Sequence, residues 1–238
     1  MKRKSKHIRL GSLVIWLMVS APVFAQQANT LTRQEKKEGW ALLFDGVSTA
    51  GWTTPAGKSV PAGWVAESGT LTAKKGAKGG DIITAREYAD FDLKFDYNIE
   101  AAGNSGVKYF YTNYETGGKL GMEYQLLDDK LAEDNKKENH LTGSFYDAIP
   151  PDASRKKVNE PGQWNTVRIV AKGRQVEHWL NGVKILEFTR GSAPFTEAIA
   201  LSKFNKTVPA FGTVEKGHIL LQEHGSEVSF RNIKIKAL

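Results

Sequence analysis

The chain has 238 residues, a formal net charge of +7, a hydrophobic content of 40% and no cysteine. The absence of cysteine excludes disulfides, thiolate catalysis and cysteine-ligated zinc. Five of the 33 Lys and Arg residues lie within residues 1–9, so the remainder is close to neutral and gives no reason to expect nucleic acid or an anionic membrane as a partner.

Residues 1–25 have the organisation of a secretory signal peptide. A basic start is followed by an apolar stretch from Leu13 to Val19, and Val23 and Ala25 occupy the small-residue positions before a cleavage site. The apolar stretch is shorter than the roughly 20 residues that a membrane helix needs, which makes a membrane anchor the weaker alternative. We expect cleavage after Ala25, a periplasmic or secreted protein without membrane insertion, and a flexible polar leader over residues 26–38.

Residues 39–238 read as a succession of short strands. Apolar or alternating runs separated by Gly, Asn, Asp and Pro cover residues 40–44, 63–73, 81–88, 91–100, 106–113, 122–128, 164–173, 175–188, 217–225 and 226–238. Asn181-Gly182 is the strongest hairpin signal. Many strands without a long helical period predict an all-β fold, an antiparallel sandwich or jelly roll.

The run GMEYQLLD (121–128) carries the most informative alternation. A two-residue period places Glu123 and Gln125 on one strand face and Tyr124 and Leu126 on the other. On an open sheet face, such a carboxylate is positioned to move a proton, although an ordinary solvated face is the alternative. The charged, Pro-bearing segment 129–163 follows, and we expect it either to overhang this face or to be a solvated excursion.

Several segments, taken in order, resemble the bacterial 3-keto-disaccharide hydrolases, also described as 3-keto-glucoside 1,2-lyases and 3-keto-2-hydroxy-glucal hydratases. The resemblance runs from about Gly39 to the C-terminus, and its specificity comes from the order and spacing of the segments. They are LFDGVSTAGW (43–52), GWVAESGTL (63–71), GGDIIT (79–84), GNSGVKY (103–109), MEYQLLDD (122–129), GSFYDAIPP (143–151), WNTVRIVAKGRQVEHWLNGVKILEF (164–188), SKF (202–204) and GHILLQEHGSEVSFRNIKIKAL (217–238). The resemblance implies a concanavalin A-like jelly roll with a carbohydrate groove.

The chemistry implied by this family explains which side chains the groove needs. A ketone at C3 acidifies the hydrogen on C2, so the C1 substituent can leave by β-elimination, and water can then add to the enone. The site needs a base, a group that stabilises the enolate and an acid for the leaving oxygen. Glu123 and His178 are the candidates for base and acid, in either order. His178 alternates with Val176 and Leu180, however, so a satisfied core histidine is the alternative.

Six further residues are candidates for substrate binding: Asn104, Ser105, Gln125, Trp179, Lys203 and Arg231. Amides and hydroxyls both donate and accept hydrogen bonds to sugar hydroxyls, a lysine stabilises an enolate, and an indole stacks on a sugar face. Each candidate also has a simpler interpretation: a turn for the GNSG residues, solvent exposure for the lysine, a surface ion pair for the arginine and the core for the tryptophan.

Cofactor and partner expectations are limited. His140 and His224 are candidate ligands of a divalent cation, but no compact metal-binding spacing is present, and no organic cofactor is expected. The implied chemistry requires a separate sugar 3-dehydrogenase to make the ketone. A non-catalytic carbohydrate-binding domain is the alternative function. An ordinary retaining glycosidase is disfavoured, because the strand continues to Leu127 and not to a second carboxylate.

Overall fold

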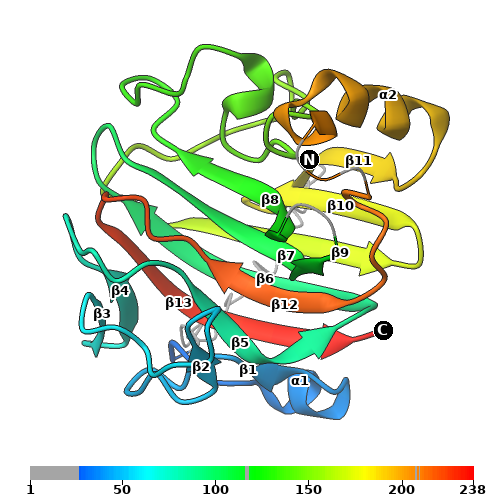
Figure 1. Cartoon of the computed structure of the whole chain (residues 1–238). Helices are drawn as coiled ribbons and strands as arrows, with labels where there is room; N and C mark the ends of the chain where they lie inside the picture. Colours follow the sequence, from blue (N-terminus) through cyan, green and yellow to red (C-terminus); the bar gives the residue numbers. More distant parts are fainter. Residues whose placement is uncertain (1–26, 116–117, 207, 209) are drawn as a thin grey trace, which may run out of the picture.

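Two antiparallel sheets pack face to face in the computed structural model, which describes residues 27–115, 118–206, 208 and 210–238 (Figure 1). The eight-stranded sheet has the order β11 (Val183–Thr189), β10 (Gln175–Leu180), β9 (Asn165–Lys172), β6 (Phe91–Ile99), β13 (Val228–Ala237), β4 (Thr70–Ala73) and β3 (Trp64–Glu67), and β1 (Ala41–Leu42) also pairs with β13. The five-stranded sheet has the order β2 (Trp52–Thr53), β5 (Ile82–Tyr88), β12 (Gly217–Leu221), β7 (Asn104–Tyr114) and β8 (Gly118–Leu127). The predicted jelly-roll sandwich is confirmed.

The core lies between the sheets and is built by strand alternation. Phe91 and Phe95 on β6 face Tyr109 on β7 and Tyr124 on β8, and all four side chains are at most 1% exposed. The rings of Phe91 and Tyr109 meet edge to face, with centroids 6.1 Å apart. Because successive residues of a strand point to opposite faces, every inward residue of β8 leaves its neighbours on the outer face of the five-stranded sheet.

The predicted hairpin at Asn181-Gly182 is confirmed between β10 and β11, with φ of 48° and 82° at the two turn residues. Helix α2 (Ala193–Leu201) was not expected, because its region has no clear helical period. Ser192 caps its first turn, and Phe195 and Ile199 pack into the core. Two 3-10 turns complete the structure, η1 (Glu138–His140) and η2 (Lys203–Lys206).

The segment expected to be a flexible leader is structured from residue 27 onward. Helix α1 (Arg33–Lys37) begins with a capping box between Thr32 and Glu35. Asn29 is buried and exchanges two hydrogen bonds with Asn232 on β13, at 2.7 and 2.8 Å. The polar composition of residues 26–38 suggested disorder, but composition does not reveal specific hydrogen bonds such as those between Asn29 and Asn232. The predicted signal peptide lies outside the described residues.

The segment between β8 and β9 runs along the edge of the five-stranded sheet, as the green loops beside β8 and α2 in Figure 1. Part of it pairs with β8. The backbone N–H of Gly143 donates to Gln125 O at 2.9 Å, and the N–H of Tyr146 donates to Glu123 O at 3.1 Å. These bonds fix residues 143–146 against the strand that carries Glu123.

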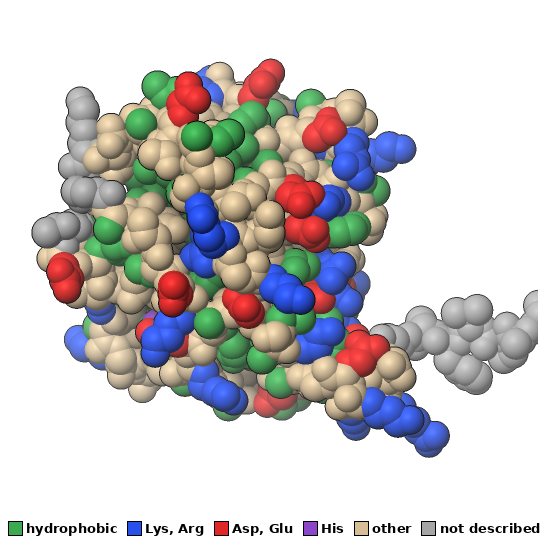
Figure 2. All heavy atoms as spheres, turned by 90° about the vertical axis from the view of Figure 1, so that its right-hand side faces the viewer, with side chains coloured by type: hydrophobic (Ala, Val, Ile, Leu, Met, Phe, Trp, Pro, Cys, Tyr) green, Lys and Arg blue, Asp and Glu red, His purple; other side chains and the backbone are tan. Residues whose placement is uncertain are grey.

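The face of the molecule shown in Figure 2 is mixed in charge. On the face shown in Figure 2, Lys and Arg side chains are interspersed with Asp and Glu side chains, so neither sign dominates that face. Within the residues that the structure describes, no helix has the length and apolar character needed to span a bilayer.

Candidate active site

Glu123 and Gln125 lie on the outer face of the five-stranded sheet, and Tyr124 and Leu126 lie in the core, as the alternation predicted. The expectation that this face is open is wrong. Glu123 is 6% and Gln125 1% exposed, because side chains from the β8–β9 segment and from η2 cover them. The result is a small polar pocket and not a solvated strand face.

The pocket has a cavity volume of about 100 Å³ and is lined by charged and amide side chains. They are Asn104, Lys108, Glu123, Gln125, Asp134, Tyr146, Lys203, Phe204, Gln222 and His224. An adjoining hollow of about 560 Å³ shares Asn104, Asp134, Tyr146 and His224 with the pocket, and Ala102 and Glu133 complete its lining. Together they offer the space of a small-molecule site, which is typically about 300 to 1,000 Å³.

Lys108 is the charged partner of Glu123. The two residues are directly opposite in the β7–β8 register, and Lys108 Nζ lies 3.5 Å from Glu123 Oε2. Burial raises the pKa of Glu123, whereas the positive charges of Lys108 and Lys203 oppose that rise. A carboxylate with a raised pKa is a stronger base than an exposed one, so this pair suits proton abstraction from carbon.

Gly106 makes room for the Glu123 side chain. A Cβ at Gly106 would collide with Glu123 Oε1, so no other residue type fits at this position without displacing the carboxylate. Beside it, the Gln125 amide lies between Glu123 and Asn104. With its nitrogen toward Glu123 the amide donates to Oε1 at 3.1 Å, and its oxygen then lies 3.2 Å from the Asn104 amide, which must present its nitrogen to donate. The carboxylate therefore has a fixed position over β7.

The wall opposite the sheet is formed by the loop segments. The Tyr146 hydroxyl donates to Asp134 Oδ2 at 2.8 Å, and Lys203 Nζ lies 4.2 Å from the centroid of the Tyr146 ring. Burial and the neighbouring Asp134 carboxylate raise the pKa of Tyr146, so its hydroxyl remains a neutral donor. The segment expected to overhang the groove thus supplies two lining residues, Asp134 and Tyr146.

Of the predicted residues, Glu123, Gln125, Asn104, Lys203 and His224 come together in this pocket. Ser105 does not join them. Its side chain is fully buried on the inner face of β7, where its hydroxyl donates to the carbonyl of Gln222 at 2.9 Å. Ser105 therefore bonds to the residue that follows β12 and does not face the pocket.

His178 is not brought to Glu123. It lies between the sheets, fully buried, with Nδ1 2.9 Å from Gly143 O and Nε2 2.9 Å from the Tyr109 hydroxyl. Burial lowers the pKa of His178 to about 4, so the ring is neutral at pH 7. Tyr124, whose ring lies against the His178 ring at 4.7 Å, separates it from the outer face. The predicted acid–base role is not supported by this placement, and the core alternative describes it.

Trp179 and Arg231 lie on the outer face of the eight-stranded sheet, away from the pocket. Trp179 donates from Nε1 to Glu177 Oε2 at 2.8 Å. Arg231 donates from Nε to Asp96 Oδ2 at 3.2 Å and stacks on Trp164, with 4.0 Å from its guanidinium carbon to the ring centroid. The structure therefore does not bring either predicted sugar-binding residue to the Glu123 pocket, because each strand presents its residue to the opposite side of the sandwich.

His140 does not line the pocket. Its Nδ1 lies 2.7 Å from Asp134 Oδ1 and its Nε2 lies 2.7 Å from Asp147 Oδ1, so both ring nitrogens already have partners. The other metal candidate, His224, is exposed and lines the pocket. Among the described residues, no group of three or more His, Asp or Glu is arranged to hold a metal ion.

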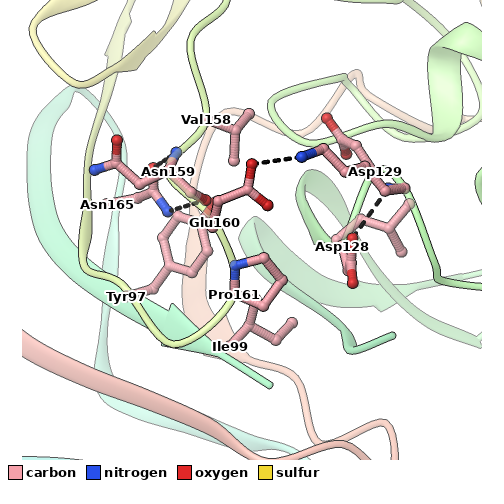
Figure 3. Close-up of a pocket in the computed structure, with 11 residues that line it drawn as sticks. Tyr97, Ile99, Asp128, Asp129, Val158, Asn159, Glu160, Pro161 and Asn165 are labelled. Atoms are coloured by element: carbon pink, nitrogen blue, oxygen red, sulfur yellow. Dashed lines mark hydrogen bonds and ion pairs between the residues drawn. The ribbon is translucent and has the colours of Figure 1, made fainter. Parts of the chain in front are cut away.

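A second cavity lies between β6 and the two ends of the β8–β9 segment (Figure 3). Its volume is about 40 Å³, and its lining includes Tyr97, Ile99 and Pro161. An ion pair between Lys130 and Glu160 spans one side. Because the cavity is far smaller than a sugar-binding site, it does not compete with the Glu123 pocket as the site.

Residues 39–236 match the model of the 3-keto-alpha-glucoside-1,2-lyase-like domain. The chain belongs to this family. A 3-keto-disaccharide hydrolase from Bacteroides thetaiotaomicron is 29% identical over 247 residues, which cover 90% of this chain and 83% of that protein. The crystal structure of a proposed glycosyl hydrolase from Parabacteroides distasonis has a TM-score of 0.79 and 36% identity, covering 89% of this chain and 100% of that one. A second such protein from the same species has a TM-score of 0.62 and 29% identity, covering 84% and 99%.

In this member of the lyase-like family, five of the ten residues that line the pocket were not among the predicted site residues: Lys108, Asp134, Tyr146, Phe204 and Gln222. Lys108 follows Gly106 at a two-residue period in GNSGVKY, which placed it on the Glu123 face once the two strands were paired. Tyr146 lies in GSFYDAIPP, one of the segments that resemble the family. No local pattern marked Asp134, because loop geometry alone brings it to the pocket.

Proposed function

We propose that the protein cleaves 3-keto-disaccharides by β-elimination, with Glu123 as the base that removes the C2 proton. The family membership and the name of the Bacteroides relative support the substrate class. The observation that carries the proposal is the buried Glu123 carboxylate, whose pKa is raised and which faces Lys108 at the floor of a polar pocket. The site thus has a base beside a cation that can stabilise an enolate.

In the proposed reaction, a Glu123 oxygen takes the proton from C2 and the C–H electron pair forms the enolate of the C3 ketone. Lys108 and Lys203, which both lower the pKa of Glu123, stabilise the negative enolate oxygen. The electron pair then returns to form the C1–C2 double bond as the C1–O bond breaks. Lys203 lines the pocket and carries ammonium protons, and we assign the protonation of the leaving oxygen to it, because the Tyr146 hydroxyl already donates its one hydrogen to Asp134. Later addition of water to the enone gives net hydrolysis.

The same proposal includes the setting of the reaction. A secretory signal peptide over residues 1–25 places the protein in the periplasm or outside the cell. Because the substrate must carry a ketone at C3, a separate dehydrogenase that oxidises the C3 hydroxyl has to act before this protein. The substrate reaches the pocket as a neutral sugar, which is consistent with a mixed lining of amides and opposite charges.

The test compares a 3-keto-disaccharide with its unoxidised parent in deuterated solvent. Turnover should be confined to the ketone, with deuterium entering at C2. Glu123→Gln keeps the shape but removes the base, so kcat should fall by about 10² to 10⁴. Glu160→Gln is the matched control, because that carboxylate lies at the second cavity. Full activity of Glu123→Gln excludes Glu123 from the mechanism, and equal cleavage of the parent makes the protein an ordinary glycosidase. Binding of the ketone without turnover returns the chain to the carbohydrate-binding alternative.

A further inference from the structure

His140 lies behind the pocket wall and contacts both of the segments that form it. Its Nδ1 lies 2.7 Å from Asp134, which accepts the Tyr146 hydroxyl through its other oxygen. Its Nε2 lies 2.7 Å from Asp147, whose second oxygen accepts the backbone N–H of Lys203 at 2.7 Å. His140 is 9% exposed and Asp147 7% exposed, and neither lines the cavity.

These contacts close into a ring. Starting at His140, the path runs through Asp134 to the Tyr146 hydroxyl, across the Tyr146 ring to the Lys203 ammonium at 4.2 Å, and back from the Lys203 N–H through Asp147. The His140 and Tyr146 rings also pack together, with centroids 4.6 Å apart. The two wall residues that face Glu123 therefore share one support.

The chemistry of the ring requires a particular form of His140. An ionised carboxylate has only acceptor oxygens, so each ring nitrogen satisfies its aspartate only if it carries a hydrogen. The groups that face the imidazole are Asp134, Asp147 and the Tyr146 ring, and Lys137 Nζ adds a positive charge 3.4 Å from Asp147. Asp147 itself has a φ of 56°, a conformation that non-glycine residues rarely adopt. Such a conformation persists when the surroundings hold it, and here four hydrogen bonds reach the Asp147 residue.

We infer that His140 is a positioning residue of the active site, a double donor that fixes Tyr146 and Lys203 at their places opposite Glu123. Its effect on catalysis rests on the proposed function, whereas its effect on the wall does not. A misplacement of about 1 Å at reacting groups costs about 10²-fold in rate. Loss of the support is therefore expected in kcat, with a smaller change in KM, because the sheet residues of the pocket stay in place.

The first measurement is independent of activity. Hydrogen exchange of a peptide that covers residues 202–206 includes the Lys203 amide, whose N–H donates a hydrogen bond to Asp147. In His140→Ala this exchange should accelerate by about tenfold, as expected when one hydrogen bond to a charged group is weakened. His218→Ala is the control, since His218 is also partly buried but bonds to Thr84 O on β5, outside the pocket. Exchange at the wild-type rate in His140→Ala overturns the inference.

The second measurement uses chemical rescue of His140→Ala. Kcat should fall by about 10- to 100-fold, and added imidazole, which donates from two nitrogens when protonated, should restore part of it. 1-Methylimidazole has only one N–H and should restore less. Equal rescue by both compounds, or a kcat equal to that of wild type, contradicts a double donor. If His140→Ala does not fold, His140→Gln replaces it, because one amide reaches only one aspartate. If the wild type is inactive and exchange is accelerated in the variant, the proposed function is rejected, but the inference that His140 supports the pocket wall is retained.

Discussion

Replacing Lys108 by Met should move the acid limb of the pH profile of kcat/KM to higher pH. Lys108 Nζ lies 3.5 Å from Glu123 Oε2, and the side chains are only 14% and 8% exposed. At an effective dielectric constant of about 20, Coulomb's law gives about 5 kcal/mol for two unit charges at this distance. Water entering the space left by the ammonium reduces this value, and opposite charges at such distances shift a pKa by about 1 to 3 units. We therefore expect a shift of about 1 to 2 pH units.

The direction follows from the protonation state that is active. Glu123 must be ionised to accept the C2 proton, so activity is lost as the pH falls through its pKa. Lys108 favours the ionised form and lowers this pKa against the effect of burial. Without Lys108 the pKa rises further, and activity is lost at a higher pH during acidification. A uniform decrease of kcat through lost enolate stabilisation would lower the whole profile without moving the limb.

The assay is the release of product from a 3-keto-disaccharide at low substrate concentration between about pH 4 and 8, where kcat/KM reports the free enzyme. Lys130→Met is the matched control, because it removes the same charge at the ion pair beside the second cavity. The limb of this control should coincide with that of wild type. An acid limb that stays in place in Lys108→Met, or moves to lower pH, would refute the assignment of Glu123 as a base held by Lys108.

Gly106→Ala should reduce kcat by at least about tenfold with little loss of stability, because the added methyl displaces Glu123; unchanged kinetics contradict this. Since the pKa of His178 is about 4 in the folded protein and about 6.5 when unfolded, the unfolded state gains the proton first, and stability should fall by on the order of 3 kcal/mol from pH 6.5 to 4. Urea titrations should show a weaker pH dependence in His178→Gln. EDTA should leave activity unchanged. A loss of activity in EDTA that a divalent ion restores would show instead that the protein needs a metal. The intact mass of the exported protein should match a chain that begins at Gln26. A mass that matches a chain retaining Met1 would exclude cleavage of a signal peptide.

Alternation along single strands carried the correct part of the sequence analysis. The fold class, the hairpin at Asn181-Gly182 and the opposite orientations of Glu123 and Tyr124 all follow from local patterns, because the two-residue period is set by backbone geometry. The same rule already indicated the core for His178, whose neighbours Val176 and Leu180 are apolar. The family resemblance pointed to a catalytic role instead, and the buried position of His178 agrees with the alternation.

Residues that reach the pocket from other elements were beyond such reasoning. Lys108 required the β7–β8 register and Asp134 required the path of a loop, whereas Lys203 was a candidate through the family resemblance and not through alternation. Trp179 and Arg231 were predicted for the pocket and lie elsewhere for a related reason. Each faces outward from its strand, but the outer face of the eight-stranded sheet and that of the five-stranded sheet are opposite sides of the molecule. A single strand does not reveal which sheet it joins.

The buried histidine still contributes to the pocket, through the loop that it supports. His178 Nδ1 lies 2.9 Å from the carbonyl of Gly143, and Gly143 begins the short segment that pairs with β8 and carries Tyr146 to the pocket. From the other side, His140 holds Tyr146 through Asp134. The loop is thus fixed by one neutral imidazole inside the sandwich and by one double-donor imidazole outside it. Because only the outer one contacts groups that line the pocket, changes at His178 should act on stability first, whereas changes at His140 should act on the rate.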